Sequence, residues 1–133
     1  MTIRLLIADD HELVREGLRA TFAPTRIDVV GEATTGAEAI QLVTAMDADV
    51  LLLDVSMPDG DGFEVLRHVR AVTSLAVVMY SMHDRDHYIR RARELGATGY
   101  LTKRASSEQL VNAIDAASRG ESHWSSVTMA ISQ

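Results

Sequence analysis

Residues 50–62 read VLLLDVSMPDGDG, and this stretch decides the fold. Its first four residues are uniformly apolar and β-compatible, which is typical of a central parallel strand covered on both faces. The apolar run ends at Asp54, and the residues after it are rich in the Pro, Gly and Asp that form turns. Asp61 and Glu64 then resemble a capping box that opens a helix over Phe63–Arg70. The stretch predicts a buried strand, an acidic strand end, a turn and a helix.

The same alternation of strand and helix extends through most of the chain. Strands are expected at 3–8, 27–30, 50–53, 75–80 and 98–101. Helices are expected at 11–22, after the capping residue Thr35, at 63–70, at 84–95 and after the capping residue Ser106. Right-handed crossovers between parallel strands place helices on both faces of a sheet. The pattern therefore predicts an α/β fold: a doubly wound, five-stranded parallel sheet with five helices.

Composition narrows the class of protein. The chain has 133 residues, 47% of them hydrophobic and 24% charged, which suits one globular domain with a real core. It has no Cys, so a disulfide framework and a thiolate metal site are excluded. The first apolar run is too short for a signal peptide and no segment is long enough to span a membrane, so a cytoplasmic protein is expected. The net charge of −6 argues against a nucleic-acid surface in this chain itself.

Chemically active side chains stand at the ends of the expected strands. The first strand ends in Asp9 and Asp10, the third in Asp54, the fourth in Ser81 and the fifth in Lys103. In open parallel sheets ligands bind beyond the carboxyl ends of the strands. Three carboxylates, a hydroxyl and an ammonium are therefore expected at one edge.

This set of groups suits phosphoryl transfer. Neighbouring carboxylates repel one another unless a cation joins them, and hard oxygen ligands suit Mg²⁺. A carboxylate can also act as a nucleophile and form an aspartyl phosphate, whose charge a metal ion and an ammonium would neutralise. Lys103 is the only Lys among 13 basic residues, and its flexible point charge can follow a small oxygen more easily than the rigid fork of an Arg.

These motifs resemble the receiver domain of response regulators, the CheY-like family. The resemblance rests on DD at 9–10, LLLDVSMPDGDG at 51–62, YS at 80–81 and GYLTK at 99–103. ADDHELVREGL and RGESHWSSVTMA are similar to the NarL/FixJ-type branch of transcriptional regulators. The resemblance implies a flavodoxin-like three-layer sandwich with strand order 2-1-3-4-5 over residues 1–119. Residues 120–133 would be a linker, or the start of a helix connecting to an output domain outside this chain.

The family resemblance also implies a role for each site residue. Asp54 would accept a phosphoryl group from a sensor histidine kinase, with Lys103 and Ser81 contacting the phosphoryl oxygens. The implied Mg²⁺ ligands are Asp9, Asp10, Asp54 and the backbone carbonyl of Ser56. Ser81 and Tyr100 would form the switch, and Ser56 and His83 would tune the rate of dephosphorylation.

The implied function is a phosphorylation-dependent signalling switch in a two-component system. It would control transcription through an attached DNA-binding domain, form a homodimer on activation, and catalyse only its own phosphorylation and dephosphorylation. The alternative is a receiver-like interaction module that is not phosphorylated. Helix capping by Asp9, Asp10 or Ser81, and a purely structural Tyr100, also stay open. Many receivers have Pro after the Lys, but here Arg104 follows, so the sequence leaves open whether the Lys103–Arg104 peptide is cis.

Overall fold

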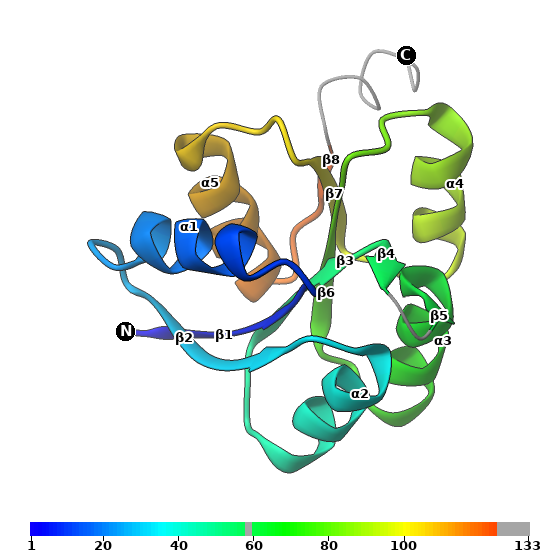
Figure 1. Ribbon diagram of the computed structural model, residues 1–133, viewed down its shortest axis with the longest axis horizontal. Coiled ribbons are helices and arrows are strands. Elements are labelled where there is room, and N and C mark those ends of the chain that lie inside the picture. The colour runs from blue at the N-terminus through cyan, green and yellow to red at the C-terminus, as the bar shows by residue number, and fades with distance from the viewer. Residues whose placement is uncertain (58–59, 125–133) are drawn as a thin grey trace.

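The computed structural model describes residues 1–57 and 60–124, and its centre is one parallel sheet (Figure 1). The main strands are β1 (Ile3–Ala8), β2 (Ile27–Ala33), β3 (Val50–Asp54), β6 (Ala76–Ser81) and β7 (Gly99–Thr102). Their order is β2-β1-β3-β6-β7, which confirms the predicted order 2-1-3-4-5. The short strand β8 (His123–Trp124) extends the sheet beyond β7.

Five helices cover the two faces of this sheet, as the sequence predicted. They are α1 (Glu12–Phe22), α2 (Gly36–Ala45), α3 (Gly62–Val72), α4 (Asp86–Glu94) and α5 (Ser107–Ser118). The apolar faces of α1 and α5 pack in one core cluster, and those of α2, α3 and α4 pack in the other. None of the helices in the described residues has the length and apolar content of a membrane span.

Strand β3 holds the two cores together. Leu51 and Leu53 belong to the cluster beneath α2, α3 and α4, whereas Val50 and Leu52 belong to the cluster beneath α1 and α5. Successive side chains of a strand point to opposite faces, so a continuous apolar run fills both cores. The strand lies between β1 and β6 and delivers Asp54 to the carboxyl edge of the sheet.

Besides β2, which runs to Ala33 where the sequence predicted an end at Val30, three local features differ from the sequence prediction. Helix α4 starts at Asp86 instead of Asp84, because the Ser81 hydroxyl accepts a hydrogen bond from the His83 backbone N–H and stabilises a turn first. The stretch predicted as a turn contains a small antiparallel pair, β4 (Ser56–Met57) and β5 (Gly60–Asp61), while Pro58 and Asp59 lie outside the described residues.

The third difference is β8, which lies in the segment predicted to be a linker. The rest of that segment, residues 125–133, where the start of a connecting helix was the other expectation, lies outside the described residues. The peptide bonds of the described residues are all trans, so Lys103–Arg104, which the sequence left open, is trans.

The connection from β3 to α3 requires glycine at position 62. A Cβ at Gly62 would lie 2.3 Å from the backbone oxygen of Asp54 and 2.7 Å from the Cα of Val55. Both neighbours are backbone atoms, so no side-chain rotation relieves the contact. The close approach also allows the Gly62 N–H to donate to the Val55 carbonyl at 2.5 Å. The absence of a side chain at Gly62 therefore helps to position Asp54.

We expect Gly62→Ala to lower the free energy of unfolding by about 3 kcal/mol, the upper end of the range for overpacking, because backbone must move. Gly17→Ala is the matched control, since nothing lies within 4 Å of the Cβ it would add inside α1. That control should be neutral or stabilise the protein by up to about 1 kcal/mol. Urea unfolding of both variants measures the difference, and equal stabilities would contradict this description of the β3–α3 connection.

Candidate functional site

The predicted site residues meet at the carboxyl edge of the sheet. Asp9 follows β1, Asp54 ends β3, Ser81 ends β6 and Lys103 follows β7. Asp9, Asp54 and Ser81 are the buried polar residues among those described, with exposed fractions of 1%, 3% and 0%. Burying polar groups is costly unless each has a partner, so the contacts between these side chains decide what the edge can do.

Lys103 joins the two buried carboxylates. Its ammonium donates to Asp9 Oδ2 at 2.8 Å and lies 3.4 Å from Asp54 Oδ2. The backbone N–H of Lys103 donates to the Ser81 carbonyl at 2.7 Å, which fixes the start of the side chain against β6. Burial lowers the pKa of the ammonium, but the hydrogen bond to Asp9 and the charge of Asp54 outweigh burial and raise it above its ordinary value. Lys103 is therefore a charged group in this site.

Asp9 is held on every side. Its Oδ1 accepts from the His11 backbone N–H at 2.8 Å and lies 3.1 Å from His11 Nδ1, while its backbone carbonyl accepts from Arg15 at 2.8 Å. With Lys103 on Oδ2, both carboxylate oxygens are occupied. The N-cap of α1 is His11, and it makes no side-chain capping bond. Asp9 is therefore not the N-cap of α1. Its carboxylate orders the loop after β1 and positions Lys103.

Asp54 has one carboxylate oxygen that accepts no hydrogen bond. Its Oδ1 accepts from the Ser56 backbone N–H at 3.1 Å, but Oδ2 is buried and accepts no hydrogen bond. Burial raises the pKa of this carboxyl above its ordinary value, and the Ser56 hydrogen bond and the Lys103 charge only partly oppose that effect. A buried carboxylate oxygen without a hydrogen bond leaves its lone pairs available to a cation or an electrophile.

The acidic edge fits a divalent cation. Ligand atoms of Asp9, Asp10, His11 and Asp54 lie within 4.8 Å of one another. Carboxylate oxygens at this spacing, one of them without a hydrogen bond, are the donors that Mg²⁺ prefers. Mg²⁺ would neutralise their repulsion and the charge of a phosphoryl oxygen. His11 is the one member of this cluster that the sequence analysis did not single out, although it directly follows the two aspartates.

Ser81, His83 and Tyr100 are joined by two hydrogen bonds at the same edge of the sheet as Asp54. The Ser81 hydroxyl accepts from the His83 backbone N–H at 3.0 Å, and the Tyr100 hydroxyl donates to the His83 carbonyl at 2.7 Å. Tyr100 is fully buried, and burial raises the pKa of its phenol to about 12. The His83 ring stacks on Tyr88 with centroids 4.4 Å apart. Ser81 caps no helix in this structure; it is linked to Tyr100 through the backbone N–H and the backbone carbonyl of one residue, His83.

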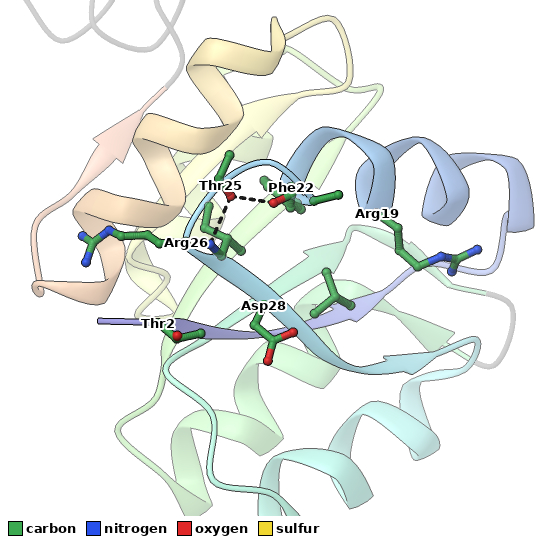
Figure 2. Close-up of a pocket in the computed structure, with 9 residues that line it drawn as sticks. Thr2, Arg19, Phe22, Thr25, Arg26 and Asp28 are labelled. Carbon is green, nitrogen blue, oxygen red and sulfur yellow. Dashed lines mark hydrogen bonds between the residues drawn. The ribbon is translucent and has the colours of Figure 1, made fainter.

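A separate hollow of about 410 Å³ lies at the opposite, amino-terminal end of β1 and β2 (Figure 2). Arg19 and Arg26 line it but point away from each other. Each is already paired, Arg19 with Glu32 at 2.5 Å and Arg26 with Asp115. No convergent charge remains there, so this hollow does not compete with the acidic edge as the functional site.

The fold and this edge together define a class of α/β signalling domain, and comparison with known proteins identifies it. The family model for the response regulator receiver domain matches residues 5–115. The chain belongs to that family, as the sequence predicted.

Individual relatives are transcription-associated response regulators. The chain is 35% identical to response regulator UvrY of Escherichia coli (strain K12), over 98% of this chain and 62% of UvrY. A two-component response regulator of the LuxR family from Aurantimonas sp. SI85-9A1 is 31% identical, with a TM-score of 0.92 over 98% of this chain and 94% of that one.

The signal receiver domain of the putative response regulator NarL from Mycobacterium tuberculosis is 35% identical, with a TM-score of 0.86 over 90% of this chain and 98% of that one. The chain spans between 55% and 62% of the length of the first curated relatives that it matches. It is thus similar to the receiver part of NarL/LuxR-family regulators.

Removing the Lys103 ammonium should destabilise the metal-free protein. Lys103→Met leaves Asp9 and Asp54 buried side by side without their cation. We expect a loss of about 2 kcal/mol in the free energy of unfolding at neutral pH, less than the ~3–5 kcal/mol of a fully enclosed pair because Lys103 still reaches water.

Arg104→Met is the matched control, since it removes an adjacent charge whose partner, Asp84, is exposed. Its cost should stay below about 1 kcal/mol. Chemical denaturation in EDTA compares the two variants. A Lys103→Met protein as stable as Arg104→Met would show that the buried carboxylates do not need this ammonium.

Proposed function

We propose that this chain is a phosphorylation-dependent switch whose acceptor is Asp54. The observation that carries the proposal is the buried Asp54 Oδ2, which accepts no hydrogen bond and lies 3.4 Å from the Lys103 ammonium. A nucleophilic carboxylate needs free lone pairs and a nearby positive charge to receive a phosphoryl group. Family membership supports the same reaction, with a phosphohistidine on a sensor histidine kinase as the donor.

Each residue then has a defined task in the transfer. An Asp54 carboxylate oxygen forms a bond to phosphorus while the phosphorus–nitrogen bond of the phosphohistidine breaks, and the nitrogen keeps the bonding electron pair. Lys103 pairs with one phosphoryl oxygen and the Ser81 hydroxyl donates to another. Asp9, Asp10, Asp54 and the Ser56 carbonyl are the proposed Mg²⁺ ligands, with Asp9 acting mainly through water because both its oxygens are already engaged.

The switch residues carry the signal away from Asp54. In this structure the Ser81 hydroxyl accepts from the His83 backbone N–H. To donate to a phosphoryl oxygen on Asp54, the hydroxyl would move toward Asp54 and away from that N–H. His83 also holds the Tyr100 hydroxyl, so the position of Tyr100 depends on the state of Ser81. Phosphorylation would shift the populations of the conformations that the surface of α4, β7 and α5 adopts. The favoured conformation would promote a homodimer or the release of an attached output domain.

The relatives are longer than this chain, which bears on the proposed DNA-binding output domain. UvrY is a response regulator of which this chain matches 62%, so a DNA-binding domain outside this chain remains part of the proposal. His83 and Ser56 lie at the rim of the acceptor site and are proposed to tune the rate at which the phosphoryl group is lost. Both are exposed, so each is free to contact an approaching water molecule.

Intact-mass spectrometry tests the acceptor directly. Incubation with phosphoramidate and Mg²⁺ should add the mass of one phosphoryl group to the wild type and none to Asp54→Asn. EDTA should abolish the adduct in the wild type. An unmodified wild type would favour the alternative, a receiver-like interaction module that is not phosphorylated, and an adduct that survives Asp54→Asn would place the acceptor elsewhere.

The lone Lys provides a sharper test. Lys103→Arg keeps the positive charge but replaces a compact ammonium with a rigid, planar fork. We expect phosphorylation by phosphoramidate to slow by at least about tenfold, which corresponds to about 1.4 kcal/mol in the activation free energy. Arg104→Lys makes the reverse exchange one residue away and should leave the rate unchanged. Equal rates for Lys103→Arg and wild type would remove any special role for the Lys side chain.

A further inference from the structure

The chain turns back onto the sheet after α5. Gly120 adopts a φ of 78°, and the backbone N–H groups of Gly120 and Glu121 donate to the carbonyls of Ala117 and Ala116, each at 2.9 Å. This arrangement ends α5 and reverses the chain, as glycine in the left-handed region commonly does. The next residues form β8, parallel to β7 at the edge of the sheet.

The register of β8 brings Trp124 beside the proposed switch residue. Gly99 pairs with His123 and Tyr100 pairs with Trp124. Paired residues of parallel strands project from the same face of a sheet, so the Tyr100 and Trp124 side chains are neighbours. Trp124 is partly buried against the same core cluster that contains Tyr100. Tyr100 is therefore enclosed in part by the residue that pairs with it.

Helix α4 holds Trp124 from the other side. The guanidinium carbon of Arg93 lies 4.5 Å from the centre of the Trp124 ring, a cation–π contact. Strand β8 therefore contacts both elements whose surface the switch is proposed to alter, namely β7 through backbone pairing and α4 through Arg93.

We propose that β8 is a latch on the switch: it docks on β7 when Tyr100 is buried and is released when Tyr100 turns outward. An outward Tyr100 would need the space beside β7 that Trp124 and Arg93 now occupy. The latch rests on the proposed function, because phosphorylation of Asp54 is what would bias Tyr100. The segment that docks on β7 is this chain's own His123–Trp124.

The direction of the coupling follows from the space around Ser81. Movement of the Ser81 hydroxyl toward a phosphoryl group leaves more room on its other side, which favours the buried Tyr100. When Tyr100 is buried, its ring leaves the space beside β7 open for Trp124. Phosphorylation should therefore tighten β8 docking. By linkage, a docked β8 must strengthen binding of a phosphoryl analogue by the same factor.

Trp124 is the only Trp in the chain, so its fluorescence reports on the latch alone. Addition of beryllofluoride, a phosphoryl analogue, together with Mg²⁺ should shift Trp124 emission to shorter wavelength and reduce its quenching by acrylamide. Arg93→Gln should weaken beryllofluoride binding about fivefold, the lower end of typical couplings between sites. Calorimetric titration measures that affinity.

Arg90→Gln is the matched control, because Arg90 lies on the same helix but pairs with Asp86. It should leave both the quenching and the affinity as in wild type. Intact-mass and acrylamide-quenching measurements on the same proteins after incubation with phosphoramidate and Mg²⁺ separate the two proposals. A protein that is phosphorylated on Asp54 but shows unchanged Trp124 quenching would overturn the latch while leaving the switch proposal intact.

Tyr100→Phe tests the latch without any phosphoryl group. The variant loses the 2.7 Å hydrogen bond to the His83 carbonyl, so the aromatic ring at position 100 is held less firmly. Acrylamide quenching of Trp124 should therefore rise. Tyr80→Phe is the control, since Tyr80 belongs to the other core cluster and should have no effect. Equal quenching in the two variants would contradict the coupling even if the protein takes no phosphoryl group.

Discussion

The ion pairs of Lys103 with two buried carboxylates are the interaction on which the rest of the site depends. Asp9 and Asp54 come from strands separated by more than forty residues, and the sheet brings them to one edge where their charges oppose each other. One ammonium from a third strand end offsets part of this repulsion, at 2.8 Å from Asp9 and 3.4 Å from Asp54. A metal ion, a phosphoryl group and Lys103 would thus all contact the carboxylate oxygens of Asp9 and Asp54. Binding of one would change the electrostatic interactions of the other two.

Hydrogen bonds also connect the acidic edge to the proposed switch residues. Ser81 is bonded through its carbonyl to the Lys103 backbone and through its hydroxyl to the His83 backbone. His83 in turn accepts from Tyr100, and Tyr100 pairs along β7 with Trp124. In the proposed switch, a displacement at Asp54 would be passed along these hydrogen bonds and packed side chains.

Most of the fold could be predicted because its signals are local. The unbroken apolar run Val50–Leu53 can be satisfied only by burial on both faces, and it became the central strand. Ser106 and Gln109 form the capping box that their spacing predicts. The meeting of Asp9, Asp54 and Lys103 was also predictable, since parallel topology alone places the carboxyl ends of strands together.

What could not be predicted depends on contacts between distant residues. Strand β8 is short and lies in a polar segment, and its pairing with β7 and the contact of Trp124 with Arg93 join residues far apart in the sequence. The start of α4 at Asp86, two residues later than predicted, follows from the turn that the Ser81 hydroxyl stabilises by accepting from the His83 backbone N–H. The engagement of both Asp9 oxygens, with His11 on one side and Lys103 on the other, is a property of the folded site alone.

The identity of the phosphorylated residue is the most direct test of the proposed function. Borohydride reduces an aspartyl phosphate to homoserine, so the modified position can be read by tandem mass spectrometry of peptides from the phosphorylated protein. The proposed chemistry predicts homoserine at position 54 and unmodified Asp at positions 9 and 10. Homoserine at either of those positions, or none after incubation with the phosphodonor and Mg²⁺, would contradict it.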